Sequence, residues 1–181
     1  MTNVEASMSL EKVVQQQGGR VLRAKVGDIY LSEMMRRENA VFGGEPCGAW
    51  IHPQVHYCPD GLLSSVLLLK ALEDENKKLT EIIEEIPKYP ILRESVACSD
   101  KTKYKVVNRI DKEISNVFPE KTEVTRVDGV RISLEDGWIL VRASGTEPLV
   151  RLTVEGESLK TAENIMKKGV DVIKQFARKV E

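Results

Sequence analysis

The first half of the chain alternates apolar patterns of helical and strand period. Leu10, Val13 and Val14 fall on one helical face, and Gly18 and Gly19 follow them as a helix stop. The later patterns predict a strand at 21–26, a helix carrying Ile29, Leu31, Met34 and Met35, strands at 40–42 and 48–51, and a helix at 62–72. This alternation predicts a three-layer α/β domain.

The patterns of one helix and one strand in this half lead to two further expectations. Residues 62–72 are apolar nearly all round, which predicts a helix buried on most of its faces. Residues 2–6 have the composition of a strand inside a sheet, but nothing precedes them that could pair on the earlier side. We therefore expect an incomplete α/β domain with an exposed strand edge at 2–6.

The second half has the patterns of an antiparallel sheet covered by two helices, an α+β layout. Ser99 or Asp100 is expected to cap the first helix, whose apolar face is Tyr104, Val107, Ile110 and Ile114. Asp128-Gly129 and Asp136-Gly137 are hairpin turn signals, and alternating strands are expected at Val130, Ile132 and Leu134 and at Val150, Leu152 and Val154. Ser158 is expected to cap a closing helix with an inward face of Ile165, Gly169, Val172, Ile173, Phe176 and Val180.

The link between the halves contains two prolines. Pro87 and Pro90 flank a short polar stretch that follows an amphipathic segment ending at Ile86. Such a stretch is typical of a domain boundary. We expect domains at residues 1–86 and 87–181.

Composition and charge exclude several partners. The net charge of -1 gives no electrostatic reason to expect nucleic acid or an acidic membrane surface as a partner. No apolar run is long enough to span a bilayer, and the first residues lack the features of a signal peptide, so we expect a cytoplasmic protein. Three cysteines without a repeated spacing indicate reduced thiols.

The most informative segment is Arg142-Ala143-Ser144-Gly145-Thr146-Glu147-Pro148, because it combines several phosphate-binding groups. The Arg142 guanidinium matches phosphate oxygens, Ser144 and Thr146 offer hydroxyl donors, and Gly145 permits a positive φ at which successive amides converge. Arg151 follows on a strand pattern and either bonds Glu147 to support the loop or is a solvated strand residue. Four such donors give a gross attraction of roughly 6 to 12 kcal/mol. Since association costs at least about 4 kcal/mol, the loop alone is expected to bind a sugar phosphate at near millimolar level.

The whole heptad resembles the phosphate-binding loop of the α-D-phosphohexomutase family, which includes phosphoglucomutase, phosphomannomutase and phosphoglucosamine mutase. Phe42-Gly43-Gly44-Glu45-Pro46-Cys47-Gly48 resembles the sugar-recognition loop of that family, and Asp60-Gly61 resembles the turn that follows it. The motifs occur in the family's order across essentially the entire chain. The resemblance implies the third, sugar-recognition domain of the family, here incomplete, followed by its fourth, TATA-binding-protein-like domain.

The resemblance also implies site residues. Arg142, Ser144, Gly145, Thr146 and Arg151 would bind the substrate phosphate, and the sugar-binding set would be Glu45, Cys47, His56, Gly27 and Asp28. On residues alone, a tight turn with an exposed acid is the better explanation of Gly43-Gly44-Glu45, and only the order of the motifs reverses that preference. Asp28 is equally well explained as a helix N-cap. Cys47 and Ala49 stand where the family commonly has serine and histidine, which leaves the identity of the hexose open.

Two loops of the family are missing from this sequence. No Ser-His-Asn run for the phosphoserine and no pair of aspartates one residue apart for magnesium occur. We therefore expect no catalytic residue and no cofactor in this chain, with Mg²⁺ implied only for the complete enzyme. In that enzyme the resemblance implies that a phosphoserine exchanges its phosphoryl group with the 1- and 6-hydroxyls of the sugar through a bisphosphorylated intermediate.

His52, His56 and Cys58 are close enough in sequence to suggest zinc, but their spacing matches no paired-ligand pattern. We expect no metal site there.

Three hypotheses follow from the sequence. The first is the C-terminal portion of a phosphohexose mutase, inactive alone, that binds a hexose phosphate. The second is a non-catalytic sugar-phosphate-binding or regulatory module that pairs with a separate N-terminal half. The third is a remnant whose loops bind nothing.

Overall fold

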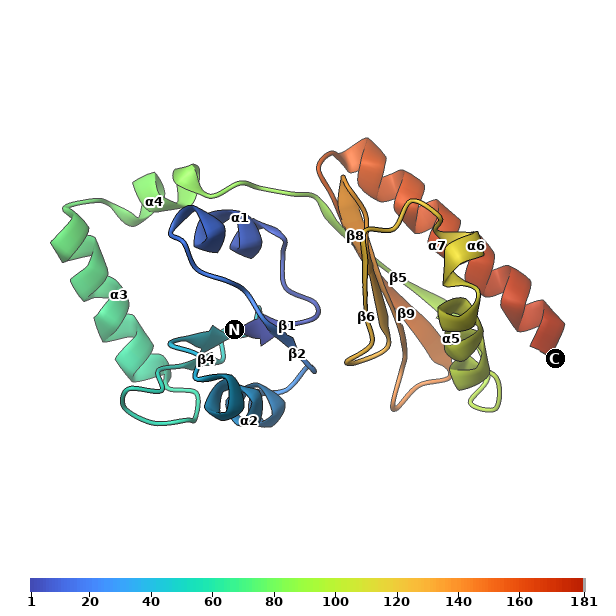
Figure 1. Ribbon diagram of the computed structural model, residues 1–181, viewed down its shortest axis with the longest axis horizontal. Coiled ribbons are helices and arrows are strands. Elements are labelled where there is room, and N and C mark those ends of the chain that lie inside the picture. Colours follow the sequence, from blue (N-terminus) through green and yellow to red (C-terminus); the bar gives the residue numbers. More distant parts are fainter. Residues whose placement is uncertain (181) are drawn as a thin grey trace. The chain divides into compact units, whose positions relative to one another are not determined.

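The computed structural model describes residues 1–180 and divides the chain into two compact units, Met1–Lys88 and the residues from Tyr89 onward (Figure 1). We refer to them as unit 1 and unit 2. None of the helices in the described part of the chain has the length and apolar composition needed to cross a bilayer.

The strands of unit 1 are only two residues long. β1 (Thr2–Asn3) pairs in parallel with β2 (Arg23–Ala24), and β3 (Gly43–Gly44) pairs in antiparallel with β4 (Trp50–Ile51). The Gly44 amide donates to the Met1 carbonyl, and the Thr2 hydroxyl donates to the Gly44 carbonyl. β1 therefore has neighbours on both sides, and the expected exposed edge at 2–6 is wrong. The returning β3 segment occupies the position that the sequence seemed to leave empty.

The helices of unit 1 complete a three-layer α/β arrangement. In Figure 1, α1 (Ser9–Gln16) lies above the short strands and α2 (Asp28–Glu38) lies below them. α3 (Gly61–Glu75) and α4 (Leu79–Glu85) follow in sequence. The hydrophobic core of the unit is small, with buried residues Ala24, Leu31, Met35 and Ile51.

The expectation that 62–72 is buried on most faces is wrong. Ser64 is the buried residue of α3, whereas Leu62, Val66 and Leu69 are 85%, 63% and 67% exposed. The apolar composition was read correctly, but burial requires a neighbouring surface. Within unit 1 the start of α3 packs against β4, and its apolar side chains lie largely in solvent.

A buried arginine connects the elements of unit 1. The Arg23 side chain is 8% exposed and forms a bidentate pair with the Glu11 carboxylate. It also donates to the backbone carbonyls of Asn3, Ala6 and Ser7. Because these acceptors lie on β1, α1 and the segment between them, one side chain fixes three parts of the unit.

Unit 2 is built on a five-stranded antiparallel sheet. Its strands are β5 (Ile91–Ala97), β6 (Glu123–Thr125), β7 (Val130–Ser133), β8 (Gly137–Ala143) and β9 (Leu149–Gly156), in the order β5-β9-β8-β7-β6. The helices are α5 (Lys103–Lys112), the short α6 (Ile114–Val117) and α7 (Leu159–Val180). The α+β layout expected from the sequence is confirmed.

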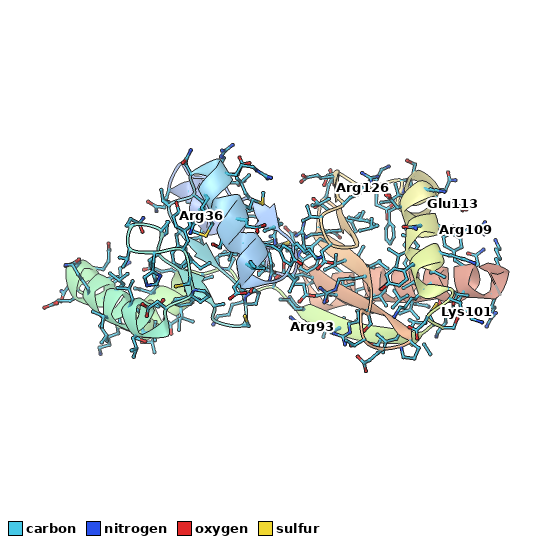
Figure 2. The ribbon with its side chains drawn as sticks, turned by 90° about the horizontal axis from the view of Figure 1, so that it is seen from below. Arg36, Arg93, Lys101, Arg109, Glu113 and Arg126 are labelled. Carbon is cyan, nitrogen blue, oxygen red and sulfur yellow. The ribbon has the colours of Figure 1, made fainter. Side chains whose placement is uncertain are left out.

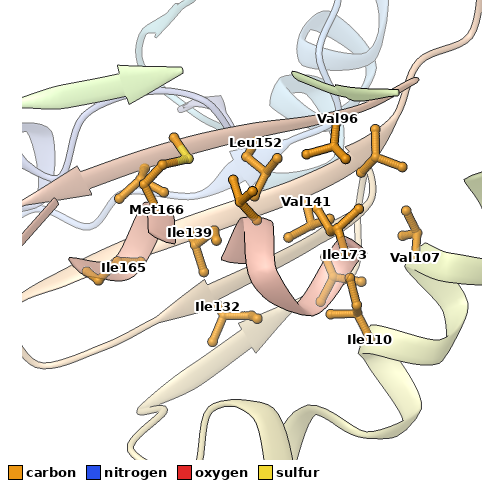
Figure 3. Close-up of a cluster of buried hydrophobic side chains, with 14 of the residues drawn as sticks. Val96, Val107, Ile110, Ile132, Ile139, Val141, Leu152, Ile165, Met166 and Ile173 are labelled. Carbon is orange, nitrogen blue, oxygen red and sulfur yellow. The ribbon is translucent and has the colours of Figure 1, made fainter. Parts of the chain in front are cut away.

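The core of unit 2 lies between the sheet and the helices. The side chains of Ile132 on β7, Ile139 on β8 and Leu152 on β9 point toward the helices. They form one cluster with Ile110 of α5 and Ile173 of α7 (Figure 3). These side chains are fully or almost fully buried. The period-two alternation read from the sequence separates the face that packs against the helices from the opposite face, where Trp138, Leu140 and Glu155 are also buried.

Turn and cap chemistry explains where the elements of unit 2 begin. Gly129 has φ 78° in the turn between β6 and β7, a conformation that favours glycine. The Ser158 hydroxyl accepts from the Thr161 amide, so the expected cap of α7 is present. The expected cap of α5 is wrong, because Ser99 and Asp100 belong to a preceding turn and Thr102 is the N-cap position.

Candidate functional site

The phosphate-loop candidate is the connection between β8 and β9. The two strands place Arg142 and Arg151 directly opposite each other. Like charges in this position repel each other. Each guanidinium also pairs with a carboxylate. Arg142 Nη1 lies 2.8 Å from Asp128 Oδ2, and Arg151 Nη2 lies 2.5 Å from Glu147 Oε2. The sequence left open whether Arg151 bonds Glu147 or is a solvated strand residue, and the structure contains the bond to Glu147.

The loop has a buried base and an exposed tip. Ser144 is buried, its amide donates to the Leu149 carbonyl, and its hydroxyl accepts from the Glu147 amide at 3.2 Å. Gly145 and Thr146 are exposed. The Ser144 hydroxyl oxygen is therefore engaged inside the loop, while the tip residues are open to a ligand.

The conformation expected of Gly145 is wrong. The described glycines with positive φ are Gly18, Gly27, Gly48 and Gly129, and Gly145 is not among them. A Cβ placed on Gly145 would meet no atom within 4 Å. In this structure the glycine leaves open space at the tip and does not form a left-handed amide nest.

Sequence reasoning missed a buried lysine beneath the loop. Lys103, at the start of α5, is 3% exposed and donates from Nζ to the Glu147 carbonyl at 3.0 Å. It also pairs with Asp100 at 2.6 Å. The Cys98 amide donates to the next carbonyl, that of Pro148. A lysine in the first turn of a helix opposes the helix dipole, and that unfavourable position was the available signal.

The sugar-loop candidate is centred on Glu45, which is buried. Its Oε1 accepts from Asn3 Nδ2 and from the Gly27 amide, each at 2.8 Å. The Cys47 thiol lies 3.9 Å from Oε2. The structure thus brings Glu45, Gly27 and Cys47 together and adds Asn3, which the sequence did not single out. The reading of Glu45 as an exposed acid on a turn is wrong, because its carboxylate bonds β1 and the Gly27 turn.

A pocket of about 430 Å³ opens beside Glu45. Trp50 and Phe42, whose rings meet edge to face at 6.3 Å between centroids, lie on its wall with Leu10 and Val14 from α1. The pocket combines aromatic and aliphatic walls with one buried carboxylate. This is the composition of a small-molecule site with a few polar anchors.

The other two residues of the predicted sugar set are bonded locally. Asp28 is exposed and accepts from the Ile29 amide at 2.9 Å. His56 lies in the loop between β4 and α3, where its ring nitrogens contact Asp60 and Cys58. Within residues 1–180, neither side chain forms a hydrogen bond to Glu45, Asn3 or Cys47.

Asp60 is the anchor of that loop. Its Oδ1 accepts from the Leu63 amide at the start of α3, and its Oδ2 lies 3.0 Å from His56 Nε2. The pKa of the Asp60 carboxyl lies below its usual value of 3.8. The hydrogen bond from the Leu63 amide is the larger cause, and the contact with His56 is the next.

The histidines and cysteine considered for zinc do not converge. His52 Nε2 lies 2.8 Å from the Ser64 hydroxyl, whereas His56 faces Asp60 and Cys58. Within residues 1–180 no group of three or more histidine, cysteine or acidic side chains is arranged to hold a metal ion.

Comparison with family models matches both halves of the chain. Residues 1–89 match the model described as phosphoglucomutase/phosphomannomutase, alpha/beta/alpha domain III. Residues 95–172 match the model described as phosphoglucomutase/phosphomannomutase, C-terminal domain.

Curated relatives match over almost the whole chain but over a minor part of their own length. A probable phosphoglucosamine mutase of Methanopyrus kandleri is 45% identical over 98% of this chain and 39% of its own. A phosphoglucosamine mutase of Methanocaldococcus jannaschii is 43% identical over 97% of this chain and 39% of its own. The chain thus spans about two fifths of these relatives.

Solved structures share the fold. A phosphoglucomutase/phosphomannomutase family protein of Burkholderia thailandensis matches with a TM-score of 0.81 and 23% identity, over 96% of this chain and 36% of its own. The N-acetylphosphoglucosamine mutase of Aspergillus fumigatus, solved with GlcNAc-6P and magnesium, matches with a TM-score of 0.67 and 14% identity, over 97% of this chain and 38% of its own. At these identities the likeness concerns the fold alone.

Proposed function

The chain belongs to the phosphoglucomutase/phosphomannomutase family, and we propose from this premise that it is the C-terminal part of a phosphohexose mutase. Its role is to bind the sugar and the non-reacting phosphate of a hexose phosphate while a phosphoryl group moves between the 1- and 6-positions. The observation that carries the proposal is the succession of domain III and the C-terminal domain along one chain, with an exposed loop held between two arginines.

The phosphate is assigned to the β8–β9 loop. Arg142 and Arg151 face each other across the ladder, so a dianion seated between them would relieve their repulsion. The Thr146 hydroxyl and the Gly145 amide are at the exposed tip, and Ser144 and Lys103 hold the base. In this proposal Asp128 and Glu147 hold the arginines in place and give up part of their pairing when the phosphate binds.

The sugar is assigned to the Glu45 cluster of unit 1. One carboxylate oxygen is held by Asn3 and Gly27, which fixes the carboxylate, and the other, whose protein donor is the Cys47 thiol at 3.9 Å, accepts sugar hydroxyls in this proposal. Cys47, Asp28 and His56 complete the proposed set. The relatives named phosphoglucosamine mutase make glucosamine phosphate the first hexose phosphate to test.

Magnesium and the phosphoryl-donating serine are assigned to the complete enzyme and not to this chain. The described residues include no cluster of carboxylates arranged for a cation, so the side chains present do not fit a Mg²⁺ site. Their contribution is to position the substrate. We also propose a cytoplasmic location, consistent with three cysteines that form no disulfide within the described chain.

A second candidate function is favoured by the exposed helix α3. In this case the chain is a non-catalytic sugar-phosphate-binding or regulatory module that pairs with a separate N-terminal half. Leu62, Val66 and Leu69 present apolar surface to solvent, and burying each would contribute about 1.5 to 3 kcal/mol. A surface of this kind indicates a partner.

The proposal is tested by NMR titration of the full chain with glucosamine 6-phosphate, with glucose 6-phosphate and mannose 6-phosphate as comparisons. We expect amide shifts at Gly145 and Thr146 with near-millimolar affinity. Arg142→Ala is expected to weaken binding by about tenfold or more, because one bond to a charged group contributes about 1.5 to 3 kcal/mol.

The matched control is Arg126→Ala. Arg126, labelled in Figure 2, also pairs with an aspartate in unit 2, Asp111 at 2.6 Å, but lies outside the loop. Its substitution is expected to leave the titration unchanged. Loop shifts that persist in Arg142→Ala, or that disappear equally in Arg126→Ala, would count against the phosphate assignment.

A mutase assay separates the two candidate functions. The purified chain alone is expected to be inactive with glucosamine 6-phosphate and Mg²⁺. Activity restored by adding the N-terminal portion of the Methanocaldococcus jannaschii relative would support a catalytic complex. Substrate binding without restored activity would favour the non-catalytic module, and activity of the chain alone would contradict both.

A further inference from the structure

The loop between β4 and α3 aligns a thiol, an imidazole and a carboxylate in one series of contacts. Cys58 Sγ lies 3.1 Å from His56 Nδ1, and His56 Nε2 lies 3.0 Å from Asp60 Oδ2. Cys58 is exposed, so small molecules in solution can reach its sulfur. The proposed sugar and phosphate assignments make no use of this thiol.

The partners of His56 determine where its protons lie. The Asp60 carboxylate only accepts hydrogen bonds, so Nε2 carries a hydrogen and donates it. Nδ1 then accepts from the Cys58 thiol, but it also lies 3.1 Å from the Cys58 carbonyl oxygen, which has no hydrogen to give. Once Nδ1 takes the thiol proton, its N–H faces both that oxygen and the thiolate. Proton transfer therefore replaces an unfavourable contact with a hydrogen bond.

The Asp60 carboxylate stabilises the imidazolium that forms when His56 takes the thiol proton. Asp60 stays ionised because the Leu63 amide and His56 both bond its carboxylate. A thiolate next to an imidazolium is the arrangement found in reactive cysteines.

We propose that Cys58 is a nucleophilic thiol that forms mixed disulfides with low-molecular-weight disulfides, with His56 accepting its proton and Asp60 positioning His56. In the reaction the Sγ proton moves to His56 Nδ1 and the thiolate attacks one sulfur of the disulfide. A new S–S bond to Cys58 forms as the old S–S bond breaks, and the second sulfur leaves as a thiolate. Cys58 is oxidised, and the small disulfide is reduced by the same two electrons.

The chain carries its own comparison thiols. Cys47 is exposed like Cys58, but the partner of its thiol is the Glu45 carboxylate, 3.9 Å from Sγ, and not an imidazole. Cys98 is buried and lies 3.2 Å from the Thr102 hydroxyl. The structure therefore orders the three thiols by reactivity as Cys58, then Cys47, then Cys98.

The test measures the reaction of the full chain with dithiodipyridine, a neutral aromatic disulfide that releases an absorbing thione. Cys47→Ser/Cys98→Ser leaves Cys58, and Cys58→Ser/Cys98→Ser leaves Cys47. At pH 7 we expect Cys58 to react about three to ten times faster than Cys47. Equal rates for the two thiols would overturn the proposal.

His56→Gln in the Cys58-only chain separates the imidazole from simple exposure. We expect its rate to fall to that of Cys47, with circular dichroism unchanged. An unchanged Cys58 rate in a folded His56→Gln chain would overturn the role assigned to His56.

Discussion

Units 1 and 2 are similar in length but are stabilised in different ways. Unit 2 packs α5 and α7 against a continuous sheet and buries a large apolar cluster between them. Unit 1 has four buried core residues and is connected by polar groups, of which Arg23 and Glu45 are the most bonded. The comparison shows that the two proposed binding elements are held differently. The β8–β9 loop is positioned by an apolar core, whereas Glu45 is positioned by hydrogen bonds between polar groups.

The largest expected effect tests the apolar framework. Ile139→Ala removes a fully buried side chain from the β8 face and is expected to destabilise unit 2 by about 2 to 5 kcal/mol. Trp138 reports unfolding of unit 2 by fluorescence in a Trp50→Phe background, since each unit contains one of the two tryptophans. Ile139→Val should cost about 0.5 to 1.5 kcal/mol. Equal losses in both variants would show that packing does not dominate here.

Arg23→Ala tests the polar framework of unit 1. It removes the bidentate pair with Glu11 and leaves the carbonyls of β1 and the following segment without their donor. We expect a loss of about 2 to 3 kcal/mol, seen by Trp50 fluorescence in a Trp138→Phe background. The exposed Arg20→Ala is the control. An unaffected unit 1 in Arg23→Ala would break the contrast between the two units.

Acid sensitivity should be concentrated at one carboxylate of unit 1. Because the folded pKa of Asp60 is below 3.8, its ionised form stabilises the fold at pH values above 3.8. This contribution is lost as the pH falls through the depressed folded pKa. Asp60→Asn should therefore be less stable than the natural chain at pH 6, and the gap should close below pH 3.8. A gap independent of pH, in denaturant titrations followed by Trp50, would contradict this.

The smallest effect is expected at the exposed helix. Leu69→Glu should change the stability of the isolated chain by no more than about 0.5 kcal/mol, because the side chain is 67% exposed. If α3 is the surface that pairs with an N-terminal portion in a catalytic complex, the same change should abolish the activity restored in that assay. The exposed Lys70→Glu on the same helix is the matched control. A loss above about 1 kcal/mol in Leu69→Glu would show that α3 is packed after all.

The sequence predicted the parts of the fold that depend on local patterns. β7 and β9 follow from alternation at Val130 and Ile132 and at Val150 and Leu152, because a pleated strand presents every second residue to the same face. The end of α1 follows from Gly18, whose φ of 72° is the usual left-handed helix stop. In both cases one local rule determines the outcome.

Predictions that depend on neighbours distant in sequence were less successful. The strand expected at 40–42 lies at Gly43–Gly44, because pairing with Met1 and β4 sets its position. The buried faces expected of 62–72 required a surface that unit 1 does not provide. The sequence could not predict that Lys103 lies beneath the loop. Its Nζ meets the Glu147 carbonyl, 44 residues later in the chain, only once the sheet has packed against α5.

The β5–β9 ladder separates the β8–β9 loop from the point where the chain enters unit 2. Pro90 and Ile91 bond at the Gly156 and Glu155 end of β9, whereas Cys98 bonds at the Pro148 end, one strand length of about 20 Å away. A mechanical pull on the incoming segment would break this ladder one rung at a time, beginning at the end remote from Pro148. The loop would thus keep its shape until the last rungs had opened.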